Sequence, residues 1–476
     1  MTDSHTDSHF ENPLGYKPIN GLLLQFSVPA IISCLINSIY NIVDQIFIGQ
    51  GIGYQGNAAT TVAFPIMTIL LAFGNMIGAG SSAFAAIRLG EKNDHEAKRT
   101  LNNAFIFAFT VGIVLMIIGI MFLHPILWLF GAKTDIVMQY AYDYTFIILL
   151  GTPFNLVSIA LSSLARTDGQ PRLAMYGILV GAILNTILNP IYIFIFHWGI
   201  RGSAIATLTS QVISALILTI YFLKDTKNPS HMKLEKKLLR PDKSLILSFT
   251  SLGTSSGITQ AAICVMLVVM NNSLTYYGDL SDVGGDVALS AMGIVMKIAT
   301  IMTSLAIGVG MGAQPILGFN KGAKNYSRIR KTYILAVSSA TILIMILWLI
   351  CHLFPENIIG IFGKESPEFT DFAVKCINIY LFGTFCAGFQ IVSCSYFQAT
   401  GQPLKAAILS TLRQLSLLVP LIIILPIKFG LNGILFSAPV ADILSAVIVA
   451  LFIIPEMKKL SQNSRIETVS AEKDLL

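Results

Sequence analysis

Twelve long apolar segments constrain the fold of this 476-residue chain more than any other feature of its sequence. A helix needs about 20 apolar residues to cross the hydrocarbon core of a bilayer. Because backbone groups in lipid find no water to bond, each of these segments is expected to be helical. The predicted spans are residues 22–48, 58–84, 101–123, 137–163, 173–196, 202–223, 246–274, 287–315, 332–353, 370–396, 404–427 and 432–455.

The scarcity of charge also indicates a membrane protein. Charged residues make up 12 % of the chain and hydrophobic residues 54 %, whereas a soluble domain carries about 25 % charged residues. The polar first 21 residues hold no short apolar core followed by a small-residue cleavage site, so we expect no signal peptide. The six cysteines lie in apolar stretches without the spacing of a metal site, which favours small buried side chains.

The distribution of lysine and arginine predicts the orientation in the membrane. With the amino terminus in the cytoplasm, 24 basic residues fall in cytoplasmic segments and only 4 in outer loops. This positive-inside bias predicts that both termini are cytoplasmic. The net charge of +6 is therefore explained by topology, and no nucleic-acid partner is expected.

The two halves of the chain repeat each other at an offset of 232 residues. Because each copy has six spans, an even number, both copies enter the membrane from the same side. This predicts an all-α integral membrane fold of twelve helices, in two six-helix lobes related by a pseudo-two-fold axis along the membrane normal. The matched pairs include Gly78 and Gly310, Gly80 and Gly312, Gly90 and Gly322, Asn93 and Asn325, Gly151 and Gly383, and Pro171 and Pro403.

The apolar spans and the repeat together divide the chain into five predicted parts. Two six-span lobes are flanked by polar tails and joined by a basic segment that could contact anionic lipid heads. The parts are a cytoplasmic tail at 1–21, an N-lobe at 22–223, a cytoplasmic linker at 224–245, a C-lobe at 246–455 and a cytoplasmic tail at 456–476.

Several motifs in combination resemble the multidrug and toxic-compound extrusion (MATE) transporters. The resemblance covers nearly the whole chain apart from the polar tails. It is strongest to the prokaryotic DinF-like and MepA-like branch, which places its acidic site in the amino-terminal half. The matching motifs are Pro29…Tyr40-Asn41…Asp44…Gly49 in the first span, Leu89-Gly90-Glu91-Lys92-Asn93 after the second, and Asn185-Thr186-Ile187-Leu188-Asn189-Pro190 in the fifth.

The resemblance implies a multidrug exporter that is driven by the inward flow of H⁺ or Na⁺. It implies amphipathic, often cationic small-molecule substrates, alternating access between the two lobes, and no cofactor other than the coupling ion. It further implies a monomer in the plasma membrane of a prokaryote, and a transporter rather than an enzyme. The chain has no Gly-x-x-x-x-Gly-Lys-Ser/Thr phosphate loop, which agrees with transport that does not use ATP.

Polar residues at helical spacing predict a cation-coupling site in the first span. Asn37, Tyr40, Asn41 and Asp44 follow the spacing i, i+3, i+4, i+7 and so form one helix face. An acid within hydrocarbon is costly, so Asp44 is expected to face a cavity and to bind the coupling ion, a proton or Na⁺. The alternative is an interfacial acid in contact with water, because Asp44 lies nearer the outer end of its span.

Spans 5 and 6 are expected to complete the coupling site. Asn185, Asn189 and Tyr192 follow the spacing i, i+4, i+7 on span 5, and Thr207 on span 6 matches a polar position of the family. In the branch that the chain resembles, the position of Asn189 is usually an aspartate. An amide cannot titrate, so one carboxylate with amide and hydroxyl oxygens is expected in place of a two-carboxylate relay.

Another branch of the family places its acids on spans 7 and 10. This chain has Gln260 on span 7 and Lys375 on span 10, so that arrangement is not supported. Lys375 occupies the repeat position of Asp143, which suggests that the two pair across the lobes at an outer gate when the cavity faces inward.

The second half carries charges of its own within its spans, at Lys297, Arg413 and Asp442. One interpretation is a structural ion pair between Asp442 and one of the cations. The other is a role in the substrate cavity or in coupling the lobes, together with Asn37, Tyr192 and Gln260.

Three other functions are weaker alternatives. A lipid-linked oligosaccharide flippase of a related superfamily would line its cavity with several basic residues, and only Lys297 and Arg413 lie deep in spans. A membrane-embedded enzyme would need a His-Glu-x-x-His run or a Ser/His pair within the spans, and no such run occurs. A channel would not need a duplicated architecture that can rock.

Overall fold

The computed structural model describes residues 12–132, 134–224, 232–362 and 367–473, and these are mostly helical with no strand among them. Twelve helices in these ranges are long and apolar enough to cross a membrane, as the sequence predicts. Parts of the predicted tails and linker, and the outer-loop residues Lys133 and Lys364, lie outside the described residues.

The N-lobe begins with a four-residue helix and then holds six long helices. The fifth span ends in a π-helical segment after Pro190. The elements are α1 (Pro13–Tyr16), α2 (Ile19–Ile52), α3 (Tyr54–Gly90), α4 (Asp94–Met121), α5 (Leu123–Leu129), α6 (Asp135–Thr167), α7 (Pro171–Pro190), η1 (Ile191–Ile195) and α8 (Gly199–Leu223).

The C-lobe follows the same order after a short 3-10 turn in the linker. Its fifth span is again interrupted by a π-helical segment. The elements are η2 (Lys236–Leu238), α9 (Lys243–Asp279), α10 (Gly285–Gly322), α11 (Tyr326–Leu353), α12 (Pro355–Phe362), α13 (Pro367–Tyr380), η3 (Phe382–Cys386), α14 (Ala387–Ala399), α15 (Pro403–Thr411), η4 (Leu412–Leu418), α16 (Val419–Phe429) and α17 (Leu431–Lys473).

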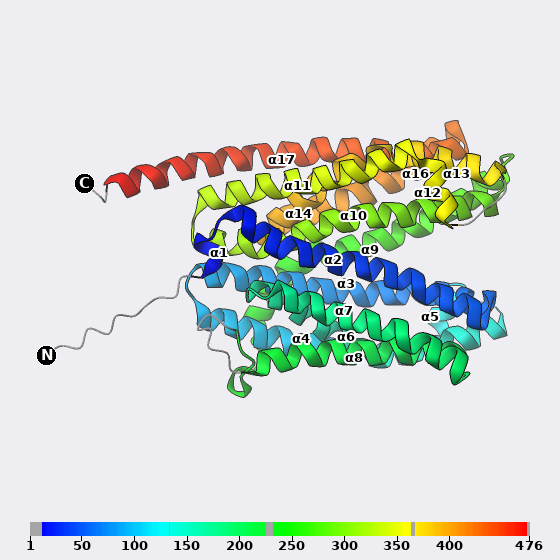
Figure 1. The fold of residues 1–476 in the computed structure, drawn as a ribbon, viewed down its shortest axis with the longest axis horizontal. Helices are drawn as coiled ribbons and strands as arrows, with labels where there is room; N and C mark the ends of the chain where they lie inside the picture. The colour runs from blue at the N-terminus through cyan, green and yellow to red at the C-terminus, as the bar shows by residue number, and fades with distance from the viewer. Residues whose placement is uncertain (1–11, 133, 225–231, 363–366, 474–476) are drawn as a thin grey trace.

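The two lobes lie side by side as elongated bundles, with α2 and α3 of the N-lobe facing α9 and α10 of the C-lobe (Figure 1). Helix α2 packs against α10, and α3 packs against α9. These are repeat-related pairs, because α2 and α9 begin the two copies and α3 and α10 follow them. The predicted fold class of two six-helix lobes is therefore confirmed.

Two glycines allow close packing of the two lobes where α3 and α10 end. A Cβ on Gly90 would overlap the carbonyl oxygen of Phe319, and a Cβ on Gly322 would overlap that of Ile87. The two contacts correspond at the repeat offset of 232 residues. Only glycine permits backbones to approach so closely. This end of the bundle, where the basic loops after Gly90 and Gly322 lie, is called the basic end below.

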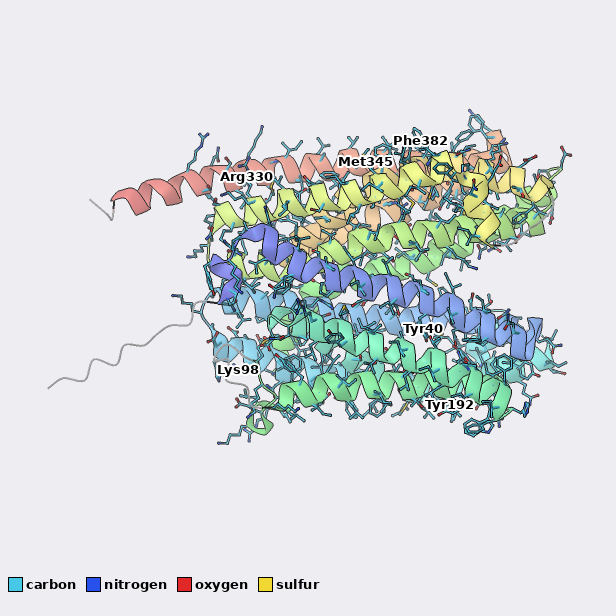
Figure 2. The ribbon with its side chains drawn as sticks, viewed as in Figure 1. Tyr40, Lys98, Tyr192, Arg330, Met345 and Phe382 are labelled. Carbon is cyan, nitrogen blue, oxygen red and sulfur yellow. The ribbon has the colours of Figure 1, made fainter. Side chains whose placement is uncertain are left out.

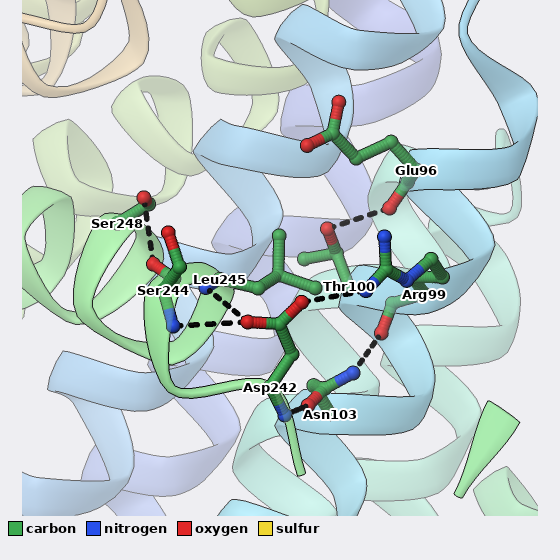
Figure 3. A network of polar contacts seen from close by, with 8 residues as sticks. All are labelled: Glu96, Arg99, Thr100, Asn103, Asp242, Ser244, Leu245 and Ser248. Carbon is green, nitrogen blue, oxygen red and sulfur yellow. Dashed lines mark hydrogen bonds and ion pairs between the residues drawn. The ribbon is translucent and has the colours of Figure 1, made fainter. Parts of the chain in front are cut away.

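The segment that leads into the C-lobe is hydrogen-bonded to the N-lobe. The main-chain N–H of Asp242 donates to Asn103 Oδ1 at 2.7 Å, and Arg99 donates to the Asp242 carboxylate at 2.5 Å (Figure 3). The other carboxylate oxygen accepts from the main-chain N–H groups of Ser244 and Leu245, so Asp242 is also the N-cap of α9.

The segment that leads into the N-lobe is likewise hydrogen-bonded to the C-lobe. Arg328 donates to the carbonyl oxygens of Leu14 and Lys17, at 3.1 and 2.8 Å. Asn320 also donates to the Leu14 carbonyl, at 3.1 Å. In each lobe, side chains therefore hydrogen-bond the segment that precedes the first long helix of the other lobe. These contacts connect the two lobes at the basic end.

Several helices extend past the predicted spans. Helix α2 begins at Ile19, and α17 continues through the predicted polar tail to Lys473. Hydropathy locates only the part of a helix that lies in hydrocarbon. Its polar ends can continue into water with their backbone groups still paired within the helix.

Candidate functional site

Asp44 on α2 lies at the centre of a buried polar group in the N-lobe. Asn189 on α7 donates its side-chain amide to Asp44 Oδ1, and Ser203 on α8 donates its hydroxyl to the same oxygen at 3.1 Å. Asn189 and Ser203 are fully buried, and Asp44 is 9 % exposed. The acid is therefore enclosed by three helices of one lobe, which is not the position of an interfacial acid bathed in water.

A second layer of hydrogen bonds supports this group. Asn185 donates to Thr207 at 2.9 Å, and the Tyr40 side chain is also hydrogen-bonded to Thr207. The six residues Tyr40, Asp44, Asn185, Asn189, Ser203 and Thr207 are called the N-lobe polar cluster below. The structure thus brings together five of the residues that the sequence assigned to cation coupling, and adds Ser203.

One acceptor in this cluster has no hydrogen-bond partner within the described part of the chain. Asn189 uses its amide nitrogen on Asp44, while its Oδ1 atom is buried without a hydrogen bond among the described residues. A buried unpaired acceptor is costly, and such groups in native structures often mark a binding site. The cluster therefore offers a carboxylate, an unpaired amide oxygen and hydroxyl oxygens within one enclosed space.

Ser203 is a cluster residue that the sequence analysis missed. It lies four residues before Thr207 on α8, and residues at that spacing share a helix face. This spacing is the signal that could have identified it.

Tyr192 lies apart from the cluster, although its spacing from Asn185 suggested a shared face. Its ring packs against Phe196 and Trp198, with ring centroids 5.9 and 5.0 Å away. The cause is the π-helical segment that begins at Ile191, because it breaks the 3.6-residue period on which the prediction relied.

Two other predicted residues differ in their exposure. Asn37 is exposed on α2, and Gln260 is half-buried on α9. The side chain of Asn41 lies outside the described residues.

The C-lobe contains an ion pair whose acid is buried. Arg413 Nε on η4 donates to Asp442 Oδ1 on α17, which confirms the ion-pair interpretation for Arg413. Gln390 on α14 donates to the Asp442 carbonyl at 2.6 Å. The Asp442 side chain is 1 % exposed, and its Oδ2 atom has no hydrogen bond among the described residues.

Neither of the other predicted charged residues forms part of this pair. Lys297 is exposed on α10, and Lys375 is exposed on α13. Asp143 pairs with Arg201 of its own lobe at 2.9 Å. The pairing of Asp143 with Lys375 therefore does not occur in this arrangement of the lobes and stays a prediction for another one.

Two membrane-spanning lobes of repeated topology, with a buried charged group inside each lobe, define a multi-pass membrane transporter. The MatE family model matches residues 29–191 and 257–424, which is most of each half. The chain belongs to the MatE family, and it is a transporter rather than an enzyme.

Similar proteins cover nearly the whole chain. The multidrug export protein MepA of Staphylococcus aureus is 24 % identical over 437 residues, which are 92 % of this chain and 94 % of MepA. MepA of Staphylococcus haemolyticus is 25 % identical, over 92 % of this chain and 93 % of its own.

Solved structures agree with this family assignment. The multidrug transporter DinF-BH, solved in complex with the dye rhodamine 6G, is 33 % identical with a TM-score of 0.84, and the match covers 93 % of this chain and 96 % of that one. An outward-facing MATE family transporter has a TM-score of 0.87 at 20 % identity, covering 94 % and 98 % of the two chains. The resemblance to the DinF-like and MepA-like branch is thereby confirmed.

Proposed function

We propose that the chain is an antiporter that exports amphipathic, often cationic small molecules in exchange for H⁺ or Na⁺ bound at the N-lobe polar cluster. The observation that carries this proposal is the enclosure of Asp44 by Asn189 and Ser203 from two other helices. The relatives named for multidrug export support the substrate class.

The cluster supplies the chemistry that a small cation needs. Oxygen atoms are the ligands of hard cations, and the cluster offers them from Asp44, Asn189 and Ser203. A proton would instead bind the Asp44 carboxylate itself, whose single negative charge has no basic partner at ion-pair distance among the described residues. Either ion would neutralise a charge that is costly inside the membrane.

Coupling follows if the bound ion changes which arrangement of the lobes is favoured. A ligand shifts such an equilibrium only by its difference in affinity for the two states. Asp44 lies on α2, which packs against α10 of the other lobe. Neutralising Asp44 would alter how α2 is held by α7 and α8, and through α2 the contact between the lobes.

We further propose a monomer in the plasma membrane of a prokaryote, with the basic end and both termini in the cytoplasm. The bias of lysine and arginine toward one side of the membrane supports this orientation. No cofactor other than the coupling ion, and no nucleic-acid partner, is proposed.

The test is efflux of rhodamine 6G from proteoliposomes, with the pH gradient and the Na⁺ gradient imposed separately. We expect one of these gradients to drive dye movement by the unaltered protein. Asp44→Asn should abolish gradient-driven movement and keep the thermal unfolding midpoint, because the amide retains the shape of the side chain but not its charge.

Asp135→Asn is the matched control, since Asp135 is an exposed acid of the same lobe, in the first turn of α6. It should retain transport. Full gradient-driven efflux by Asp44→Asn, or an equal loss in both variants, would remove the N-lobe polar cluster from the coupling mechanism.

A further inference from the structure

Lys297 lies on the face of α10 that meets α2. Nearer the basic end, Ser304 on this face hydrogen-bonds Ser38 of α2 at 3.1 Å. Gly308 faces Ile31 so closely that a Cβ would lie 2.6 Å from the Ile31 Cα atom. Lys297 precedes these two positions by seven and eleven residues, which is two and three helical turns, so all three point in the same direction.

The two lobes separate beyond the Ser38–Ser304 contact. Lys297 on α10 and Gln45, which follows Ser38 by seven residues on α2, are both exposed. At Gly293, one further turn along the same face, an added Cβ would meet no atom within 4 Å. The ribbons of α2 and α10 also diverge toward the end opposite the basic end (Figure 1). Lys297 therefore faces the space between the lobes.

Lys297 and Asp44 lie at a similar depth in the membrane. Lys297 precedes Ser304 by seven residues and Asp44 follows Ser38 by six, and both steps rise about 10 Å from the shared contact. Asp44 is turned aside into the N-lobe, where Asn189 and Ser203 hold it. Of these two charges, Lys297 is therefore the one that is exposed between the lobes.

No acid pairs with Lys297 among the described residues. Arg413, the other deep cation of the C-lobe, is already paired with Asp442. An ionisable residue within the membrane is costly, and it usually faces a cavity and binds a partner of opposite charge. The unpaired ammonium group is therefore available to a ligand.

We propose that Lys297 binds an anionic oxygen group, such as a carboxylate, phosphate or sulfonate, carried by the transported molecule or by a lipid headgroup. This inference rests on the proposed function, because it refines the substrate class to amphipathic molecules that include an acidic group. A zwitterionic molecule would present its acidic group to Lys297. Asn271 is exposed on the face of α9 that contains Gly253 and Gly257, which meet α3, so it adds an amide on the C-lobe side of the boundary between the lobes.

The test compares two dyes that differ by one charge. Rhodamine 6G is an ester, and its free acid adds a carboxylate to the same ring system. Equilibrium binding of each dye to purified protein in phosphatidylcholine nanodiscs, followed by fluorescence polarisation, gives a ratio of the two dissociation constants. We expect Lys297→Met to weaken binding of the acid by about tenfold, the effect of losing one charge-assisted hydrogen bond, and to leave the ester unchanged.

Two further variants control for size and for total charge. Lys297→Arg keeps the cation and should retain the preference for the acid. Lys428→Met removes an exposed lysine of α16 and should change the binding of neither dye. If Lys297→Met leaves the ratio of the two dissociation constants unchanged, including through an equal loss for both dyes, the proposal is overturned. Lys297 would then be a lysine that extends toward the membrane surface without binding an anion.

Nanodiscs that also contain phosphatidylglycerol distinguish the two sources of the anion. If lipid headgroups occupy the site, this lipid should weaken acid binding to the unaltered protein but not to Lys297→Met. If the transported molecule alone uses the site, the lipid should have no effect. Because binding is measured without any gradient, a failure of ion-driven efflux would reject the proposed antiport and leave this result standing.

Discussion

Asn189 donates its amide to Asp44 and keeps its own side-chain oxygen buried without a partner among the described residues. The two residues are 145 positions apart in the chain and lie on helices α2 and α7. Tyr40, one helical turn before Asp44 on α2, marks this region on the N-lobe side of the boundary between the lobes (Figure 2). The contact therefore links the helix that faces the other lobe to the interior of its own lobe.

Asn189→Asp should change the ion dependence of transport. A second carboxylate adds negative charge and an oxygen ligand beside Asp44, so the site should hold its cation more tightly. The pH or Na⁺ concentration that gives half-maximal dye efflux should therefore shift toward less of the coupling ion. An unchanged dependence in proteoliposomes would place position 189 outside the coupling site.

Ser203→Ala should weaken ion coupling without abolishing it. The change removes one hydroxyl partner of Asp44, a contribution of about 1 kcal/mol, so the half-maximal ion concentration should change by roughly fivefold. Ser210→Ala is the matched control on the same helix, because the Ser210 hydroxyl bonds to the Ala206 carbonyl of its own helix. Equal effects of the two substitutions would count against a role for Ser203.

Gly322→Ala should open the basic end. The added methyl group would collide with the Ile87 carbonyl, so the lobes would have to part there. Labelling of a cysteine introduced at Ile87 by a membrane-impermeant thiol reagent should become faster, after the native cysteines are replaced. Gly21→Ala, where nothing lies within 4 Å of the added atom, should leave the rate unchanged.

Breaking the Arg413–Asp442 pair from one side should destabilise the protein more than removing both partners. A single substitution leaves the other charge without its partner, and for the fully buried Asp442 carboxylate this costs about 3–5 kcal/mol. Arg413→Met and Asp442→Leu should each lower the thermal unfolding midpoint in detergent, and the double variant should recover part of the loss. Strictly additive losses would show that the pair is not coupled.

Much of the candidate site could be predicted because it depends on helical spacing. Asp44 and Tyr40 share a stripe on α2, and Asn185 and Asn189 share one on α7, so each set could be identified within one helix. Ser203 shares a helix face with Thr207 on α8, so its spacing could have identified it as a candidate, but its contact with Asp44 crosses between helices and comes from the tertiary structure. Tyr192 does not share the cluster face, because a π-helical segment has no clear signal in the spacing of apolar residues.

The sequence by itself determined the number of spans, their repeat and the family. These follow from lengths of apolar segments and from motifs, which are local properties of the chain. Only the tertiary structure decided which charges meet: Asp442 takes Arg413 as its partner, and Lys297 is left facing the space between the lobes. Partner choice depends on distances between side chains of different helices, and these are set by how closely small residues let the helices approach.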